Sequence, residues 1–360
     1  MPKIDELLKI VKDAHASDLH LGAGSVPMIR IDGVLAKTRH KKLAGKNIKQ
    51  LVYEILTDEQ IRRFERSGDL DFAYSIDSLA RFRINLYKMH SGPAAAIRLI
   101  PDDIPGLASL GFSDVVADMA RSKSGLVLVT GPTNSGKSTT LAAMVDHINI
   151  HESRHIITLE DPIEYLHTNK NSLISQRQIG LHSESFASAL RAALREDPDV
   201  VLVGEMRDTE TISLAITAAE IGLLVLGTLH TCSATSSVDR IIDVFAPNQQ
   251  QQIRVMLADT LVGVISQQLL KRADGRGRVA AYEVMARSSA IQAMIREERT
   301  YQIPSVIQTS RKKGMRLLDN HLKALVDSSI VTAEEAIRVA VNPAEFYDRV
   351  KEEQSEPVEA

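Results

Sequence analysis

The chain has 360 residues, of which 44% are hydrophobic and 25% charged, and these values exclude disordered and fibrous proteins. Its 43 Lys and Arg residues against 46 Asp and Glu residues give a net charge of −3, which does not favour a nucleic-acid-binding polycation. The single cysteine, Cys232, excludes an intramolecular disulfide and a four-cysteine zinc site. No apolar run reaches the ~20 residues of a membrane helix, so we expect a cytoplasmic α/β protein of two domains.

Residues 1–100 are predicted to form the first domain, which mixes helices and strands. Apolar residues at helical spacing predict helices over residues 4–14, 48–56 and 58–66, the last with Thr57 as its N-cap. Apolar or alternating runs predict strands over residues 26–31, 34–35, 72–76, 80–89 and 94–100. Residues 16–21 are expected to form a turn.

The clearest break in the chain begins at Pro101 and includes Pro105 and Gly106. Two prolines block both helix and ladder hydrogen bonds, and the polar residues between them favour contact with solvent. We therefore predict an interdomain linker over residues 101–111.

From residue 112 the pattern changes to strands and helices in alternation. Continuous apolar strands are predicted over residues 125–130, 155–159, 200–203 and 223–228. Helices are predicted over residues 137–148, 186–195, 208–220 and 249–270, and residues 279–325 are expected to be largely helical. This order indicates a parallel sheet covered on both faces, in a second domain over residues 112–350, followed by a disordered acidic tail over residues 351–360.

The segment Gly131-Pro-Thr-Asn-Ser-Gly-Lys-Ser138 matches the phosphate-binding pattern G-x4-G-K-[ST] between a predicted strand and a predicted helix. Glycines let backbone N–H groups surround phosphate oxygens, and the start of the helix adds positive potential. We expect Lys137 to reach the β- and γ-phosphates of ATP and Ser138 to ligate Mg²⁺. The residues predicted to bind the nucleotide are Pro132, Thr133, Asn134, Ser135, Gly136, Lys137, Ser138 and Thr139.

Acidic residues follow two of the predicted strands, where parallel sheets place their ligands. Glu160, Asp161 and Glu164 follow the strand over residues 155–159, and Glu205 follows the strand over residues 200–203. Phosphoryl transfer to water needs one carboxylate to activate the water and another to hold the hydration shell of the metal. Glu164 and Glu205 are our candidates, with Glu205 contacting Mg²⁺ through water, and the sequence leaves open which of them is the base.

His230 and several arginines complete the candidate set. His230 follows the strand over residues 223–228 and is expected to hydrogen-bond the γ-phosphate, although a purely structural role stays open. Arg81, Arg83 and Arg98 lie on predicted strands of the first domain and could reach phosphates of an adjacent subunit, or form ordinary surface ion pairs. Arg195 and Arg207 flank the strand over residues 200–203 and could serve the site within one chain.

These segments together resemble the secretion ATPase superfamily, and most closely its type IV pilus retraction ATPases, over roughly residues 1–350. The resemblance is carried by Gly131–Thr139, Leu159–Tyr165, Gly204-Glu205, Leu229–Thr231, Ala16–Leu21 and the arginines at 81, 83 and 98.

The resemblance implies an N-terminal PAS-like domain, a C-terminal RecA-like P-loop ATPase core with a helical C-terminal part, and a homohexamer. It further implies cytoplasmic motors associated with the inner membrane at the pilus base, where they dock on a platform protein and act beside an extension ATPase or a paralogue. Their work is pilin depolymerisation, which drives twitching motility.

Two features bear on retraction as against extension. Pilus extension ATPases carry a tetracysteine zinc motif, which a chain with one cysteine cannot form. The retraction family has a C-terminal Ala-Ile-Arg-Asn-Leu-Ile motif, and Ala290–Ile295 differs from it at the three middle positions, so regulation of a paralogue stays an alternative to retraction itself.

Other classes of function remain open on the residues alone. A RecA-like DNA motor would be stimulated by polynucleotide, which we do not expect for this chain. A phosphotransferase would release little phosphate without its acceptor, and a regulatory ATP binder would release none with Mg²⁺ alone.

Overall fold

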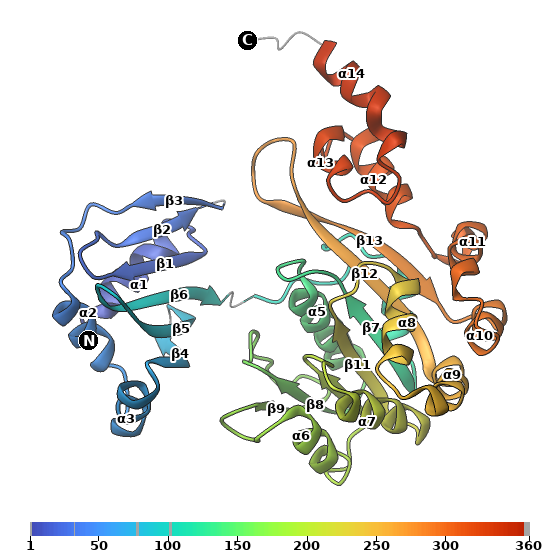
Figure 1. Ribbon diagram of the computed structural model, residues 1–360, viewed down its shortest axis with the longest axis horizontal. Helices are drawn as coiled ribbons and strands as arrows, with labels where there is room; N and C mark the ends of the chain where they lie inside the picture. The colour runs from blue at the N-terminus through green and yellow to red at the C-terminus, as the bar shows by residue number, and fades with distance from the viewer. Residues whose placement is uncertain (1, 32, 77–78, 101–102, 356–360) are drawn as a thin grey trace. The chain divides into compact units, whose positions relative to one another are not determined.

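A computed structural model describes residues 2–31, 33–76, 79–100 and 103–355 (Figure 1). The chain divides into two compact units, Met1–Asp103 and Ile104–Ala360, which we call the small unit and the large unit. Each unit contains one β-sheet with its own helices, so the predicted α/β class is confirmed.

The strands described in the small unit form a six-stranded sheet of order β3-β2-β1-β6-β5-β4, in which all neighbours are antiparallel. Its strands are β1 (Asp18–Gly22), β2 (Met28–Ile31), β3 (Val34–Lys37), β4 (Asp69–Ile76), β5 (Ala80–Met89) and β6 (Gly92–Ile100). Its helices are α1 (Ile4–Asp13), α2 (Gly45–Tyr53) and α3 (Asp58–Ser67).

Alternation along β5 decides which face of the small sheet is buried. Phe82, Ile84 and Leu86 are fully buried in a core shared with residues of α1, α2 and α3. Arg81 and Arg83 lie between them and are half-buried, because successive strand side chains point to opposite faces. The sheet therefore packs one face on helices and carries polar side chains on the other.

Local capping explains where α3 begins. The Thr57 side chain accepts a hydrogen bond from the Gln60 backbone N–H, and the Gln60 side chain accepts one from the Thr57 N–H, at 3.3 and 2.9 Å. This reciprocal pair satisfies two N–H groups that the first helical turn leaves without partners, so the N-cap predicted at Thr57 is confirmed.

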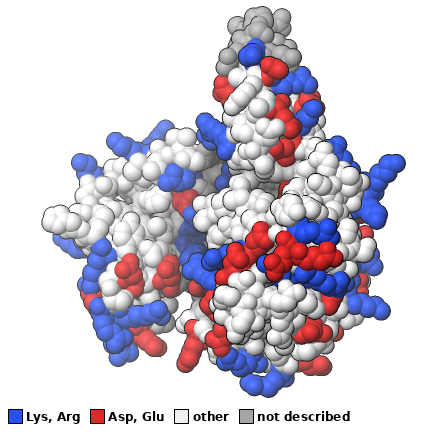
Figure 2. Space-filling view, turned by 45° about the vertical axis from the view of Figure 1, so that its right-hand side comes forward, with Lys and Arg blue, Asp and Glu red and all other residues white. Residues whose placement is uncertain are grey.

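Lys and Arg side chains gather low on the small unit, at the level of α3 (Figure 2), and this helix contains Arg62, Arg63 and Arg66.

The strands described in the large unit form a seven-stranded sheet of order β13-β12-β7-β11-β10-β8-β9. All neighbours from β12 to β9 are parallel, and only β13 is antiparallel to β12 within these described strands. The strands are β7 (Gly125–Thr130), β8 (His155–Glu160), β9 (Leu173–Gln178), β10 (Val200–Val203), β11 (Leu224–Leu229), β12 (Leu261–Lys271) and β13 (Arg278–Ala286).

Strand β7 shows why the central strands are continuously apolar. Leu126 and Leu128 belong to one core cluster and Val127 and Val129 to another, and all four are fully buried. Because alternate residues enter cores on opposite faces, neither face of this sheet tolerates a polar stripe. The doubly covered parallel sheet predicted for this region is confirmed.

The helices of the large unit follow the strands in chain order (Figure 1). They are α4 (Asp114–Ala120), α5 (Lys137–His151), α6 (Phe186–Ala193), α7 (Thr209–Glu220), α8 (Ala234–Asp243), α9 (Pro247–Thr260), α10 (Ser289–Arg296), α11 (Ile303–Thr309), α12 (Leu318–Asp327), α13 (Ala333–Ile337) and α14 (Tyr347–Ser355), with 3-10 helices η1 (Thr300–Gln302), η2 (Arg311–Lys313) and η3 (Pro343–Phe346).

The structure corrects several predicted elements. The helix predicted over residues 249–270 ends at Thr260, and its second half is strand β12, whose mostly buried residues pair with β7 and β13. Strand β13 occupies the start of a region predicted to be helical, because the pairing with β12 outweighs local helical spacing. Strands β1 and β9 were missed, since both are short and carry polar residues.

The predicted linker and tail are also revised. Residues 101–102 lie outside the described residues, but Leu107 is buried in a core cluster of the large unit together with Phe112. The second half of the predicted linker is therefore packed on the large unit. Helix α14 continues through residues 351–355, which were predicted to be disordered, and residues 356–360 lie outside the described residues.

Candidate functional site

The phosphate-binding loop joins β7 to α5, as the sequence predicts, and its glycines occupy positions closed to other residues. Gly131 has φ +146°, and a Cβ there would overlap the Gln267 carbonyl oxygen. Gly136 has φ +90°, and a Cβ there would lie 2.9 Å from Gln267 Nε2. The backbone therefore curls more tightly than a side chain allows, which is the form that surrounds a phosphate with N–H groups.

Lys137 lies within this loop. Its Nζ donates hydrogen bonds to the carbonyl oxygens of Gly131 and Pro132, at 2.8 and 2.9 Å. Burial lowers the pKa of Lys137, and the carboxylates of Glu205 and Glu164 partly offset that effect. The ammonium group is thus held at the mouth of the loop, with two carboxylates near enough to interact with its charge.

The first turn of α5 supplies the other groups expected to meet a nucleotide. Ser138 is exposed and Thr139 is half-buried. Thr139 Oγ1 is 2.9 Å from the hydroxyl of Tyr165, which connects this turn to the acidic segment after β8. The N–H groups of a 15-residue helix provide an anion-binding terminus beside the loop.

Strand β12 holds the loop in place through Gln267, a residue that the sequence analysis missed. Its Nε2 donates to the Ser135 carbonyl oxygen at 2.6 Å, and its Oε1 accepts from Thr140 Oγ1 at 2.8 Å. Gln267 is 2% exposed, so both hydrogen bonds are protected from water. The sequence signal for Gln267 was the polar pair Ser266-Gln267 inside an apolar run. The sequence analysis assigned this run to a helix and therefore did not predict a strand beside β7.

Glu205, His230 and Arg207 converge after β10 and β11. His230 Nε2 is 2.8 Å from Glu205 Oε1, and Arg207 Nε forms an ion pair with the same oxygen. Burial alone would raise the pKa of Glu205, but the hydrogen bonds and charges of Arg207 and His230 outweigh it and lower that pKa. The structure thus brings together three of the predicted residues at the carboxyl end of the sheet.

The acids after β8 divide into two environments. Glu160 Oε1 accepts hydrogen bonds from Thr158 Oγ1 at 2.7 Å and from Gln176 Nε2 at 3.2 Å. Burial raises the pKa of Glu160, with the two hydrogen bonds opposing the shift. Glu164 is half-buried in the loop beyond, near enough to Lys137 to affect its pKa, whereas Asp161 is exposed. Glu160 is thus engaged in hydrogen bonds with Thr158 and Gln176, whereas Glu164 interacts with the charge of Lys137.

The remaining arginines lie elsewhere. Arg195 follows α6 and is exposed near the amino end of β10, whereas the phosphate loop follows the carboxyl end of β7. The structure therefore does not bring Arg195 next to the phosphate loop of its own chain, because neighbouring parallel strands have their amino ends at the opposite edge of the sheet.

Arg83 and Arg98 are cross-strand neighbours on the polar face of the small sheet, and Arg81 lies on the same strand face. Arg98 Nε is 3.0 Å from Asp18 Oδ1, and Arg83 Nε is 3.8 Å from Asp71 Oδ1. Arg30 Nε also approaches Asp18, at 3.8 Å. We call Arg30, Arg81, Arg83 and Arg98 the arginine row.

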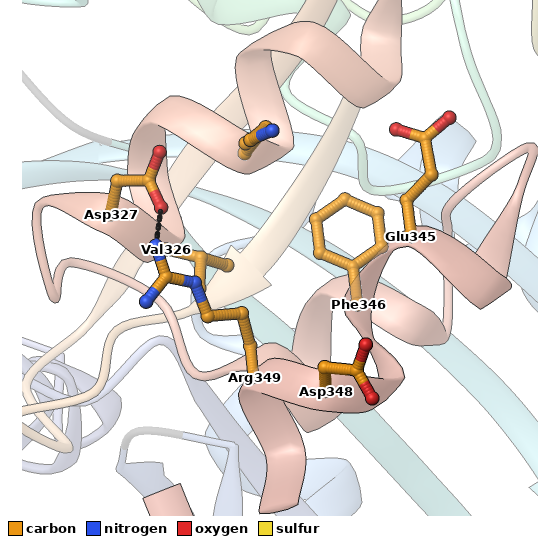
Figure 3. A pocket seen from close by; sticks show the side chains of 7 residues that line it. Val326, Asp327, Glu345, Phe346, Asp348 and Arg349 are labelled. Carbon is orange, nitrogen blue, oxygen red and sulfur yellow. Dashed lines mark hydrogen bonds and ion pairs between the residues drawn. The ribbon is translucent and has the colours of Figure 1, made fainter. Parts of the chain in front are cut away.

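A separate cavity of about 170 Å³ lies among the C-terminal helices (Figure 3). Its lining includes Phe346 from η3 and an ion pair of 2.9 Å between Arg349 and Asp327. Acidic and basic groups are mixed around it, so it offers no single charge to a ligand. We assign it no part in the site.

No helix within the described part of the chain is both long enough and apolar enough to cross a membrane.

Comparisons with known proteins show the family to which this chain belongs. The family described as type II/IV secretion system protein matches residues 1–338. The chain is 46% identical to the type IV pilus retraction ATPase PilT of Pseudomonas aeruginosa over 95% of this chain and 99% of that protein. It is also 46% identical to a twitching motility protein of Neisseria gonorrhoeae, over 88% of this chain and 84% of that one.

A crystal structure of the pilus retraction motor PilT with bound ADP is similar to the whole chain. The TM-score is 0.88 at 43% sequence identity, over 95% of this chain and 98% of that chain. The chain therefore belongs to the type II/IV secretion system family. It is an ATPase with an N-terminal domain and a C-terminal ATPase core, so the predicted fold and the predicted nucleotide-binding class are confirmed.

Proposed function

We propose that this chain is a Mg²⁺-dependent ATP hydrolase that powers type IV pilus retraction by pilin depolymerisation, and thereby twitching motility. The observation that carries the proposal is the convergence of Lys137, Glu205 and His230 on one edge of the sheet, in a chain similar over its length to pilus retraction ATPases.

The residues of the loop fit a nucleoside triphosphate. A Cβ at Gly131 or Gly136 would meet Gln267, so glycine keeps the loop in a shape that can turn its N–H groups toward a phosphate. Lys137 would exchange its two loop carbonyls for phosphate oxygens. The site's residues are Pro132, Thr133, Asn134, Ser135, Gly136, Lys137, Ser138 and Thr139.

The donor set also fits Mg²⁺, which prefers oxygen ligands and keeps several of its waters. The Ser138 hydroxyl would bind the ion directly and the Glu205 carboxylate through water. When bound, Mg²⁺ neutralises charge on the phosphate oxygens. The lowered pKa of Glu205 suits a residue that stays charged there.

We propose that Glu164 is the base that accepts the proton of the attacking water. A lowered pKa makes Glu205 a weak base, and His230 and Arg207 already occupy one of its oxygens. Glu164 follows the neighbouring strand and interacts electrostatically with Lys137. His230 contacts Glu205 and is followed by the segment that leads to α8. A change in the position of Glu205 would therefore be passed through His230 to that segment.

The arginine row supports action in trans within a homohexamer. Like charges directly opposite each other, as at Arg83 and Arg98, destabilise a sheet unless anions lie close to them. Asp18 and Asp71 supply part of that charge, and phosphates of a neighbouring chain would supply the rest. We propose that Arg81, Arg83 and Arg98 act in this way, while Arg207 serves the site of its own chain.

We place the working motor in the cytoplasm, peripherally on the inner membrane at the pilus base. Its partners there would be the platform protein of the pilus machine and the extension ATPase or a paralogous ATPase. We propose no nucleic-acid partner, because the arginine row is interrupted by Asp18 and the chain's net charge is −3.

Deletion of the gene tests this function directly. Loss of a retraction motor should leave cells with excess surface pili and no twitching, and the intact gene should restore movement. A gene with Lys137→Ala should not restore it, and a gene with Lys123→Ala, an exposed lysine of the same unit, should. Cells without pili after deletion would show extension instead, and unchanged pili and motility would remove the chain from this process.

A further inference from the structure

A line of buried hydroxyl groups connects the phosphate loop to the His230 segment. Thr130 and Ser237 have no exposed surface, and Ser266 is 2% exposed. Thr130 Oγ1 is 2.6 Å from Ser266 Oγ and 3.3 Å from Ser237 Oγ, and Ser237 Oγ is 2.6 Å from Thr231 Oγ1. We call Ser266, Thr130, Ser237 and Thr231 the hydroxyl chain.

Two members of the hydroxyl chain, Thr130 and Thr231, lie next to residues of the two halves of the site. Thr130 is the last residue of β7 and directly precedes Gly131, whose carbonyl oxygen binds Lys137 Nζ. Thr231 directly follows His230, whose Nε2 meets Glu205 Oε1. Ser266 directly precedes Gln267, so adjacent residues of β12 bind Thr130, just before the loop, and Ser135 within it.

Ser237 is the junction of this chain. Its hydroxyl lies within donating distance of three acceptors: the Ser233 carbonyl oxygen at 2.6 Å, Thr231 Oγ1 at 2.6 Å and Thr130 Oγ1 at 3.3 Å. A serine hydroxyl has one proton, so it serves the first turn of α8 and the end of β7 in competition.

Helix α8 is also fixed at its first residue. The carboxylate of Glu283, on β13, accepts a hydrogen bond from the Ala234 N–H at 2.7 Å and is 7% exposed. Glu283 pairs with Ser266 across β12 and β13. Two contacts therefore hold the start of α8: Ala234 with Glu283 of β13, and Ser237 with Thr130 at the end of β7.

We propose that Ser237 and Thr130 are positioning residues for ATP hydrolysis, which hold the His230–Glu205 pair in register with the phosphate loop. The inference rests on the proposed ATPase site. Replacing either residue by an apolar one of equal size would leave the buried hydroxyl of its partner unpaired, which is costly. Because these two hydroxyl groups position the reacting groups, their loss should affect kcat more than KM.

Matched substitutions at Thr130 separate the hydroxyl from the shape of the side chain. Thr130→Val keeps the shape and removes the hydroxyl, and it should lower kcat about tenfold, with the KM for ATP within about twofold. Thr130→Ser keeps the hydroxyl, removes a methyl group, and should retain most of kcat. Thr260→Val, another buried threonine of the large unit, is the control and should leave kcat unchanged.

Coupling is measured with Ser237→Ala. Alone it should also lower kcat about tenfold, and combined with Thr130→Val it should cost no more than the worse single substitution, because both break one chain. Multiplied effects, about a hundredfold together, would overturn the proposal, as would a Thr130→Val enzyme with wild-type kcat. If Ser237→Ala does not fold, the comparison of Thr130→Val with Thr130→Ser still decides.

The same assay separates this inference from the proposed function. A folded wild-type chain that releases no phosphate from ATP with Mg²⁺ overturns both. An active wild type whose Thr130 variants all behave alike overturns the hydroxyl chain alone.

Discussion

The small unit and the large unit each contain one sheet, but the small sheet packs a single core on one face and the large sheet packs a core on each face. In the small sheet, Arg83 and Arg98 stand opposite each other within the strands. In the large sheet β10 is apolar throughout and β7 is apolar up to Thr130, and the predicted site residues follow where these strands end.

The difference teaches where charge is permitted. A one-sided sheet can hold arginines within its strands, because their heads lie on the face without helices. A two-sided sheet admits polar groups only as satisfied pairs, such as Thr130 with Ser266, and its chemistry lies at the carboxyl edge. This difference fits the proposed roles, in which the arginine row of the small unit contacts phosphates and the large unit hydrolyses ATP.

The largest expected effect concerns the large unit alone. Lys137→Ala removes the ammonium group from the phosphate loop and should reduce ATP turnover below detection while leaving the fold intact. Phosphate release and thermal unfolding measure the two outcomes, with Lys123→Ala as the control. Near-wild-type turnover in the Lys137 variant would separate the loop from the reaction.

The next effect tests whether the two units cooperate between chains. Arg98→Ala should lower turnover about 10³-fold without weakening ATP binding, because the charge acts in the transition state. Arg62→Ala, on α3 of the same unit, should have little effect.

Mixing the two variant proteins tests whether the arginine and the phosphate loop of different chains act together. Arg98→Ala has an intact loop and Lys137→Ala has an intact arginine row, so mixed assemblies should recover activity that neither protein has alone. A mixture that assembles but stays inactive would contradict action in trans.

A smaller effect distinguishes the units by pH. Burial and the nearby Arg316 lower the pKa of His321 to about 4, from an unfolded value near 6.5. The folded state binds fewer protons in this range, so His321 stabilises the large unit fully above pH 6.5. It loses about 3 kcal/mol of that contribution as the pH falls through 4.

Chemical unfolding at pH 7 and pH 4 measures this contribution. His321→Gln should flatten the dependence of the large unit on pH, whereas His90→Gln, an exposed position of the small unit, should not. If the free energy of unfolding of the His321→Gln variant changes with pH as much as that of the wild type, the assignment to His321 is contradicted.

The smallest effect compares helix caps. Thr57→Ala should lower the free energy of unfolding of the small unit by about 1 kcal/mol, and Ser288→Ala should do the same for the large unit. Calorimetry should show each substitution moving a different transition. One shared transition that moves in both variants would show that the units unfold together.

Local patterns were enough to predict much of this molecule. The phosphate loop was identified because glycines, a lysine and a serine at fixed spacing lie between a strand and a helix that the sequence also predicts. Strands β7 and β10 were predicted to the residue, since their continuous apolar runs end sharply at glycines. Arg195 was misplaced because sequence distance from a strand does not tell which end of the sheet a residue occupies.

The amino-acid sequence by itself determined the phosphate loop, the acids and histidine after the strands, and the one-sided and two-sided character of the two sheets, because each depends on residues within a few positions of one another. Tertiary structure alone decided that residues 261–271 form β12 and that Gln267 grips the loop. It also decided that Thr130 meets Ser237 across 107 positions of the chain. These depend on pairing between distant segments, and the free energy of that pairing outweighs any local preference.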